Sequence, residues 1–287
     1  MSEVSFSAPS TLLEAAQAVA EDEALAVAGG TSIGLLLRQR LIEPTALVSL
    51  HRIPDLTDIR MTESGELELG AAVTLAALAR SATVRETFPA LAKAAGVVGN
   101  ARVRSIATIG GAMAHADPRQ DVPPVLTALN ASVHTIDSGG SNRSIPVREF
   151  LRGLMDTALN EDELIASITI PVPAGAFSSY FRFTPGSVED YPTVSVAVGW
   201  MRSPDNRVVG LDLALGSVGS TPIHVPGAEL CNGAATPQDI HAFAQHAASL
   251  TDPVTDRLGS DRYKRHVVAV FAERMLNDAL PRPAEVR

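Results

Sequence analysis

Cysteine is almost absent from this chain of 287 residues, which contains only Cys231. A single cysteine excludes an intramolecular disulfide, a cysteine-rich zinc site and an iron–sulfur cluster held within the chain. Histidine-based metal sites are not indicated either, because the seven histidines show no ligand spacing. We therefore expect no metal in this chain, and we expect Cys231 to be a small buried residue.

Lysine is also scarce, with Lys93 and Lys264 alone, and the formal net charge is −9 with a pI near 5.3. A chain this acidic is not expected to bind nucleic acid or anionic membranes. No run of uncharged apolar residues approaches the roughly 18 that a membrane span requires. The first residues lack the basic segment and apolar core of a signal peptide. These absences favour a cytoplasmic protein with no membrane span.

The chain does contain two glycine pairs bordered by threonine or serine, Gly29-Gly30 and Gly110-Gly111. Adjacent glycines permit positive φ and close approach to the main chain, and exposed N–H groups in such turns bind anions. Each pair alone could be an ordinary tight turn. Neither fits the P-loop pattern or the three spaced glycines of the dinucleotide fingerprint, which disfavours a P-loop kinase and a Rossmann dehydrogenase. A bound diphosphate would fit both pairs.

The hydrophobic pattern divides the chain at Pro171–Gly175, a segment rich in proline. Before it, helices and strands are mixed, and a third glycine pair at 139–140 predicts a plain hairpin turn. After it, strands precede two helices, which predicts an antiparallel sheet covered on one side.

Ser10, Thr74 and Ser260 are the expected N-caps. Helices are expected at 10–22, 33–40, from 74, 88–95, 123–129, 237–249 and 261–279, and strands at 25–28, 47–50, 67–70, 131–136, 164–170, 179–183, 194–201 and 208–215.

Two segments give the chain a specific resemblance, AGGTS at 28–32 and ATIGGAMAHADPRQD from Ala107. They resemble the FAD-binding medium subunits of molybdenum hydroxylases, the family of carbon monoxide dehydrogenase and xanthine dehydrogenase. The segment from Asp256 to Arg265 is similar to the family's closing motif, in which Tyr263 is expected to anchor the last helix. The resemblance implies an α+β fold with a two-lobe FAD-binding domain of the PCMH (vanillyl-alcohol oxidase-like) type. Its implied units are lobe 1 at 1–53, lobe 2 at 54–172 and an α+β C-terminal domain with an antiparallel sheet at 173–287.

The resemblance also implies which residues surround FAD. Both glycine segments are expected to wrap the diphosphate through backbone amides, although family members often carry asparagine where this chain has Ala112. Asp121 matches an acidic position near the flavin, and Ile165 and Arg182 match positions beside the isoalloxazine ring or ribityl chain. Tyr191 could cover a face of the ring. The implied FAD-binding residues are Ala28, Gly29, Gly30, Thr31, Ser32, Thr108, Ile109, Gly110, Gly111, Ala112, Asp121, Ile165, Arg182 and Tyr191.

Several of these residues have a second interpretation. Tyr191 could be a core residue between the lobes, and Arg182 could be an ordinary surface arginine. His115 and Asp117 could act in acid–base chemistry, since histidine titrates near neutral pH, or could stabilise the loop around the cofactor. The resemblance implies no catalytic residue in this chain, because FAD carries the chemistry and the protein binds and tunes it.

As a family member, the chain would be the electron-transfer subunit of a larger oxidoreductase. Substrate would be oxidised at molybdopterin in a large subunit. Electrons would pass through two [2Fe-2S] iron–sulfur clusters of a small subunit to FAD, and then to an acceptor such as NAD or a quinone. The resemblance implies a dimer of such heterotrimers. Carbon monoxide, purines, N-heteroaromatics and aldehydes all remain open as substrates.

Two other functions are compatible with the same fold. A stand-alone flavin oxidase or reductase would carry its own catalytic set and usually a longer sequence, and the closing motif argues against it. A non-catalytic scaffold that has lost FAD is disfavoured by the intact glycine pairs, because unused glycines only weaken a fold.

Overall fold

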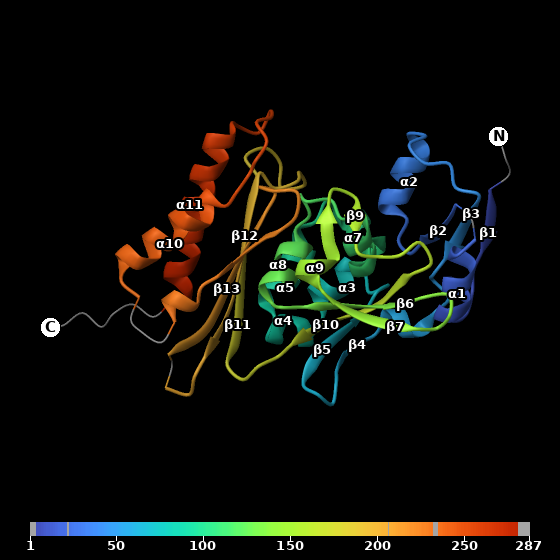
Figure 1. The fold of residues 1–287 in the computed structure, drawn as a ribbon, viewed down its shortest axis with the longest axis horizontal. Coiled ribbons are helices and arrows are strands. Elements are labelled where there is room, and N and C mark those ends of the chain that lie inside the picture. Colours follow the sequence, from blue (N-terminus) through green and yellow to red (C-terminus); the bar gives the residue numbers. More distant parts are fainter. Residues whose placement is uncertain (1–3, 22, 206, 232–234, 281–287) are drawn as a thin grey trace.

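A computed structural model of the chain describes residues 4–21, 23–205, 207–231 and 235–280. Within these ranges the strands form three principal sheets and one two-stranded ribbon. The sheets follow one another along the long axis of the molecule, in chain order from right to left in Figure 1. None of the described helices combines the length and apolar character needed to cross a membrane. The expected α+β fold is confirmed.

The first sheet is parallel, with the strand order β1-β3-β2. Thr11, and not the expected Ser10, caps α1 in a capping box with Glu14, and the helix begins at Leu12 and not at residue 10. No residue of α2 is buried, although its sequence is TSIGLLLR. The elements are β1 (Ser5–Ser7), α1 (Leu12–Val19), β2 (Ala24–Val27), α2 (Thr31–Arg38) and β3 (Ala46–Ser49).

The second sheet is antiparallel, with the order β4-β5-β10-β6-β7. Thr74 caps α3 as expected, and the glycine pair at 139–140 lies in the turn between β6 and β7. Four short helices, at 82–87, 101–106, 109–115 and 147–150, were not predicted from the sequence. The elements are β4 (Ile59–Met61), β5 (Glu66–Gly70), α3 (Leu75–Arg80), α4 (Ala82–Thr87), α5 (Pro89–Val97), α6 (Ala101–Ile106), α7 (Ile109–His115), α8 (Val122–Ala128), β6 (Ser132–Ile136), β7 (Asn142–Pro146), α9 (Val147–Phe150), β8 (Leu151–Gly153), β9 (Asp156–Thr157) and β10 (Leu164–Pro171), with a 3-10 turn at Pro54–Thr57.

The third sheet is antiparallel, with the order β11-β12-β13-β14, and both helices after it have the predicted bounds. These elements are β11 (Ala176–Phe183), β12 (Val194–Arg202), β13 (Val208–Gly216), β14 (Ile223–Pro226), α10 (Pro237–Ser249) and α11 (Asp261–Ala279), with a 3-10 turn at Ala228–Leu230.

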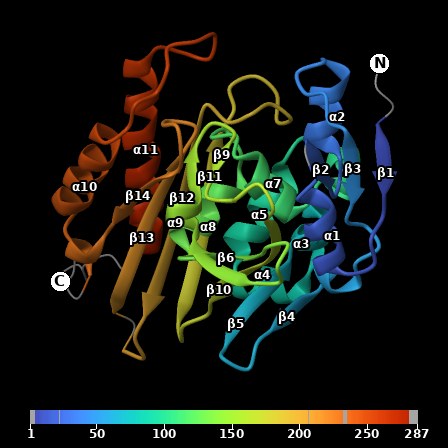
Figure 2. The ribbon, with the colours of Figure 1, turned by 45° about the vertical axis from the view of Figure 1, so that its right-hand side comes forward.

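Helices cover the third sheet on both faces, not on one as expected. α11 packs on β12 from one side, while α5 and α8 of the preceding part pack on β11, β12 and β13 from the other (Figures 1 and 2). Residues 194–199 of β12 are accordingly all buried, in place of the alternating pattern of a half-exposed strand. The sequence could not show this, because the second cover comes from helices located far upstream.

Lys264 holds the segment before α11, whereas the ring of Tyr263, the expected anchor of this helix, packs beside Gly259 of the same segment. The Lys264 side chain is 5% exposed, and its Nζ lies 2.8 Å from Asp256 Oδ1 and donates to the Val254 carbonyl at 2.7 Å. Tyr263 is exposed, whereas Ser260 caps the helix as expected. Cys231, expected to be buried, is only half-buried.

Candidate functional site

The first glycine pair lies against the start of the second glycine segment in the folded chain. A Cβ built on Gly29 would lie 1.9 Å from the Ile106 carbonyl oxygen and 3.1 Å from Ala107 Cα. Only a residue without a side chain allows the two main chains to come this close. The turn after β2 therefore lies directly against the junction between α6 and α7.

The first glycine turn presents unused main-chain donors. Gly30 has φ of +69° and is the N-cap of α2. Among the residues that the structure describes, no hydrogen bond uses the main-chain N–H groups of residues 28–33. These N–H groups lie at the positive end of the α2 dipole, where anions bind. Thr31 and Ser32 add hydroxyl donors at the same place.

The second glycine pair has a different geometry from the one expected. Gly110 and Gly111 lie in the first turn of α7, which Thr108 caps by accepting the Gly111 N–H at 3.1 Å. The N–H of Gly110 donates to the Ala71 carbonyl at 2.9 Å, and that of Ile109 donates to Val73. The amides of residues 109–112 are therefore occupied within the protein, and these residues do not present the free N–H groups expected for binding a diphosphate.

Gly110 instead allows α7 to pack on the end of β5. A Cβ at Gly110 would lie 2.6 Å from the Ala71 Cβ, whereas Gly111 is exposed. Ala71 also donates its N–H to the Ala166 carbonyl, next to Ile165 on β10. Ile165 itself is buried in the main core. The second glycine segment thus supplies a surface without side chains, with Ala112 half-buried beside it.

Asp121 and Arg182 form a buried ion pair where α8 begins beside β11. Their side chains are 5% and 9% exposed, and Arg182 Nη1 lies 3.2 Å from Asp121 Oδ2. The Tyr180 hydroxyl donates to Asp121 Oδ1 at 2.6 Å. Arg182 also donates to the carbonyls of Val97, at 2.7 Å, and Asp190. The sequence left open a surface position for Arg182, and the structure excludes it.

Burial dominates the electrostatics of Asp121. It raises the pKa of this carboxyl to about 6, although the Tyr180 hydrogen bond and the Arg182 charge act in the opposite direction. Burial likewise raises the pKa of Tyr180 well above its usual value, so its hydroxyl stays protonated and donates. The carboxylate is thus a buried anion that titrates near neutral pH.

The shifted pKa predicts how stability depends on pH. Because the pKa of Asp121 is higher in the folded chain than its usual 3.8, its contribution is complete below about pH 4 and is lost as the pH rises through about 6. At about 1.4 kcal/mol per pKa unit, the loss is about 3 kcal/mol. Urea unfolding should therefore show Asp121→Asn gaining about this much relative to the wild type between about pH 4 and pH 7. A difference that stays constant over this range would contradict the assignment.

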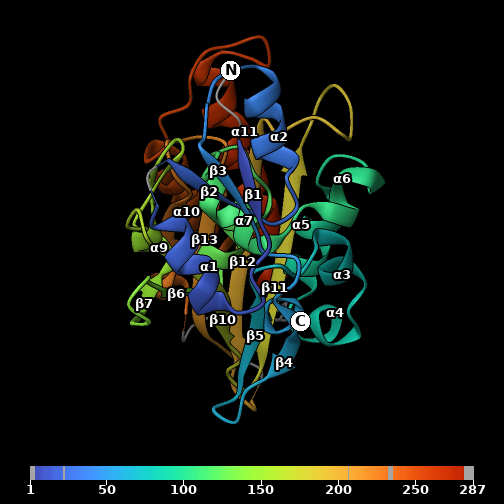
Figure 3. The ribbon, with the colours of Figure 1, turned by 90° about the vertical axis from the view of Figure 1, so that its right-hand side faces the viewer.

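A second, more open layer of side chains lies beside this pair. The Arg119 guanidinium stacks on the Tyr191 ring at 4.6 Å, and Asp117 accepts both the side chain and the main-chain N–H of Arg119. Tyr191 is 46% exposed, so it is not a core residue. Asp117 is buried and shapes the loop after α7, which favours a stabilising role over acid–base chemistry. The loops before β12 and before α11 lie at the same end of the molecule as α2 (Figure 3).

Sequence reasoning missed three residues of this region. Tyr180 could have been suspected from its strand, because the alternation in 176–183 places its side chain inward together with Ser178 and Arg182. Arg119 and Ala71 carry no such signal. Their roles depend on a stacking partner and on a helix that lie far away in the sequence.

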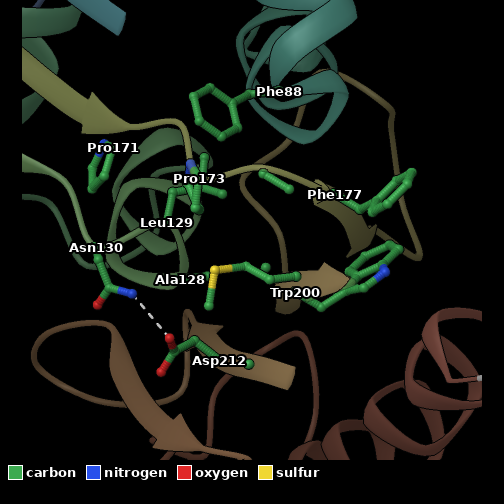
Figure 4. Close-up of a pocket in the computed structure, with 13 residues that line it drawn as sticks. Phe88, Ala128, Leu129, Asn130, Pro171, Pro173, Phe177, Trp200 and Asp212 are labelled. Carbon is green, nitrogen blue, oxygen red and sulfur yellow. Dashed lines mark hydrogen bonds between the residues drawn. The ribbon is translucent and has the colours of Figure 1, made fainter. Parts of the chain in front are cut away.

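A separate cavity of about 240 Å³ lies between α8 and the third sheet. Phe177 and Trp200 stack along one wall, and an Asn130–Asp212 hydrogen bond of 2.9 Å closes another side (Figure 4). Phe177 precedes Arg182 by five residues on β11, which corresponds to about 16 Å along a strand. No residue that the sequence assigned to a site lines this cavity.

Comparisons with known proteins cover nearly the whole chain. Residues 2–173 match the family of the FAD binding domain in molybdopterin dehydrogenase, and residues 179–279 match the CO dehydrogenase flavoprotein C-terminal domain. The alpha subunit of the 6-hydroxypseudooxynicotine dehydrogenase complex from Paenarthrobacter nicotinovorans is 32% identical, over 91% of this chain and 88% of its own.

Solved structures also resemble this chain over nearly its whole length. The carbon monoxide dehydrogenase of Hydrogenophaga pseudoflava has a chain with a TM-score of 0.89 and 29% identity, over 96% of both chains. Quinoline 2-oxidoreductase from Pseudomonas putida 86 has one with a TM-score of 0.87 and 28% identity, again over 96% of both chains.

Proposed function

Because this chain belongs to the family of FAD-binding medium subunits of molybdenum hydroxylases, we propose that it carries electrons from the iron–sulfur clusters of a partner subunit to an external acceptor. The chain is an oxidoreductase subunit, and its cofactor is FAD. When bound, FAD supplies the electron-transfer chemistry, and the residues of the chain bind it, orient it and tune its potential. NAD or a quinone is the proposed acceptor.

The diphosphate of FAD is proposed to lie at the N-terminus of α2. The observation that carries this assignment is the set of N–H groups of residues 28–33, which bind no other residue of the described chain and lie at the positive end of a helix. Gly29 keeps this turn against the α6–α7 junction, so the second glycine segment lies beside the same ligand. Residues 28–32 would bind through N–H and hydroxyl donors, and residues 108–112 through a surface that admits close approach.

The isoalloxazine end of FAD is proposed to lie toward Asp121, Ile165, Arg182 and Tyr191. The ring of Tyr191 is half exposed and stacked on a cation, which suits a position against a planar ring. The buried Nε of Arg182 has no hydrogen-bond partner among the residues that the structure describes, so this guanidinium keeps one donor unused. The open N–H groups of the α2 turn and the half-exposed ring of Tyr191 are what a bound flavin would contact.

The partners are proposed to be a large molybdopterin subunit and a small iron–sulfur subunit, assembled as a dimer of heterotrimers in the cytoplasm. The relatives support this, since they include medium chains of carbon monoxide dehydrogenases and a subunit of a dehydrogenase complex. The proposed units remain lobe 1 at 1–53, lobe 2 at 54–172 and the C-terminal domain at 173–287. The three sheets support this division, because each lies within one of these ranges.

The visible spectrum of the purified chain tests the proposal most directly. We expect the two flavin absorption bands to persist after desalting, either at once or after addition of FAD. An affinity-tagged chain should also bring down a large and a small subunit from its own host. A colourless chain that does not take up FAD would overturn the proposed site. A chain that binds FAD but never associates with an iron–sulfur subunit would contradict the proposed electron path.

A further inference from the structure

The buried cluster of Tyr180, Asp121 and Arg182 joins β11 to the start of α8, and Asp121 follows the last residue of α7 by six residues. The helix has seven residues, from Ile109 to His115, and is therefore about 10 Å long. A ligand with its diphosphate at the glycine pairs must extend past α7 if its ring is to reach Tyr191. Because Arg182 donates to the Asp190 carbonyl, next to Tyr191, the cluster adjoins the proposed ring position.

The cluster connects four separate segments through Arg182. Its guanidinium is held by the Val97 carbonyl at the end of α5, by Asp121 at the start of α8 and by the Asp190 carbonyl in the loop before β12. Of these three partners, only Asp121 carries charge. The carbonyls orient the guanidinium. The carboxylate neutralises its charge at a position where the Arg182 side chain is only 9% exposed.

Tyr180 decides whether Asp121 can serve as that counter-charge. Its side chain is 2% exposed, and its hydroxyl donates to Asp121 at 2.6 Å. A hydrogen bond to the ionised form of a buried carboxyl is one of the few means of keeping it charged. The charged and titratable groups around Asp121 are Tyr180 and Arg182 on β11, Asp117 and Arg119 in the loop before α8, and Tyr191 in the loop before β12.

We propose that Tyr180 is a positioning residue of the flavin site: its hydroxyl keeps the Asp121 carboxylate charged and in place, and Asp121 holds the Arg182 guanidinium at the ring end of FAD. The inference rests on the proposed function. It adds a residue with no direct contact to the cofactor, acting through two others. Its consequence is electrostatic, because the net charge of the cluster depends on one hydroxyl.

Tyr180→Phe removes that hydroxyl and keeps the ring. The pKa of Asp121 should then rise further above about 6, because the hydrogen bond that favours its charged form is lost. At neutral pH more of the carboxyl is protonated, and Arg182 is left without its counter-charge. A more positive cluster favours the reduced flavin, which carries more negative charge, so the midpoint potential of bound FAD should rise.

A dye-equilibrated redox titration of the full chain with FAD, at pH values from about 5 to 8, measures this effect across the titration of Asp121. The potential of Tyr180→Phe should exceed that of the wild type most strongly near neutral pH. The two should converge on the acid side, where Asp121 is protonated in both. Asp121→Asn has no carboxylate at any pH. Its midpoint potential should therefore match that of the wild type on the acid side and exceed it near neutral pH. Tyr263→Phe is the matched control, since Tyr263 is exposed, and it should follow the wild type throughout.

The outcomes separate this inference from the proposed function. A wild-type chain that binds no FAD defeats the proposed function before Tyr180 is tested. Full FAD occupancy with the same potential in Tyr180→Phe and the wild type at every pH overturns the role of Tyr180 alone. It is also overturned if Tyr180→Phe loses FAD while Asp121→Asn retains it, because Tyr180 would then not act through Asp121.

Discussion

One added methyl group at Gly29 should weaken FAD binding by this chain roughly 100-fold. In Gly29→Ala the new Cβ would lie 1.9 Å from the Ile106 carbonyl oxygen and 2.6 Å from its carbon. Both are main-chain atoms and cannot rotate away as a side chain could, so the turn must move off the α6–α7 junction. Overpacking of this kind costs about 3 kcal/mol. If this cost applies to the FAD-bound form of the chain and not to the free form, FAD affinity drops roughly 100-fold, as flavin fluorescence titration would show.

Gly34 provides the matched control within α2. A Cβ at Gly34 meets no atom within 4 Å, and the residue is exposed. Gly34→Ala should bind FAD like the wild type and should stabilise the chain by up to about 1 kcal/mol, because alanine is the better helix former. Wild-type FAD affinity in Gly29→Ala would mean that the contact between the two glycine segments is not needed for the site.

Replacement of Arg182 by methionine should destabilise the chain more than any other single change at the buried cluster. The variant leaves Asp121 buried without its cation and removes the donors that hold Val97 and Asp190. Breaking one partner of a buried ion pair costs about 3–5 kcal/mol. Urea unfolding near neutral pH should show this loss. The loss should shrink below the pKa of Asp121, about 6, where the carboxyl no longer needs a counter-charge.

A double variant and a surface control define the origin of that loss. Asp121→Asn in the Arg182→Met background should recover part of the stability, because no buried charge is then left unpaired. Arg60→Met is the control, since Arg60 pairs with Glu68 while its side chain is 62% exposed, and surface pairs contribute little. Equal losses in Arg182→Met at acid and neutral pH would show that packing, and not the charge of Asp121, sets the cost.

Local sequence patterns determined much of this fold. The bounds of α10 and α11 follow from apolar periodicity together with the Thr236 and Ser260 caps, which act within one helical turn. Strands in the C-terminal part were found because valine and leucine alternate along them. The family also followed from the sequence, because the two glycine segments and the closing motif occur together. Each of these signals is contained within a few neighbouring residues.

Contacts between distant segments decided the rest. The sequence gives Gly29 and Gly110 the same appearance, yet one lies against Ile106 beside unused N–H groups and the other packs on Ala71 with its own N–H occupied. Arg182 is buried only because Asp121 and two carbonyls meet it there, and Lys264 is buried because Asp256 and the Val254 carbonyl bind its ammonium group. Such roles depend on which main-chain and charged groups come within hydrogen-bonding distance after folding. No local pattern encodes that distance, so the sequence determined the kind of site and the tertiary structure determined which atoms form it.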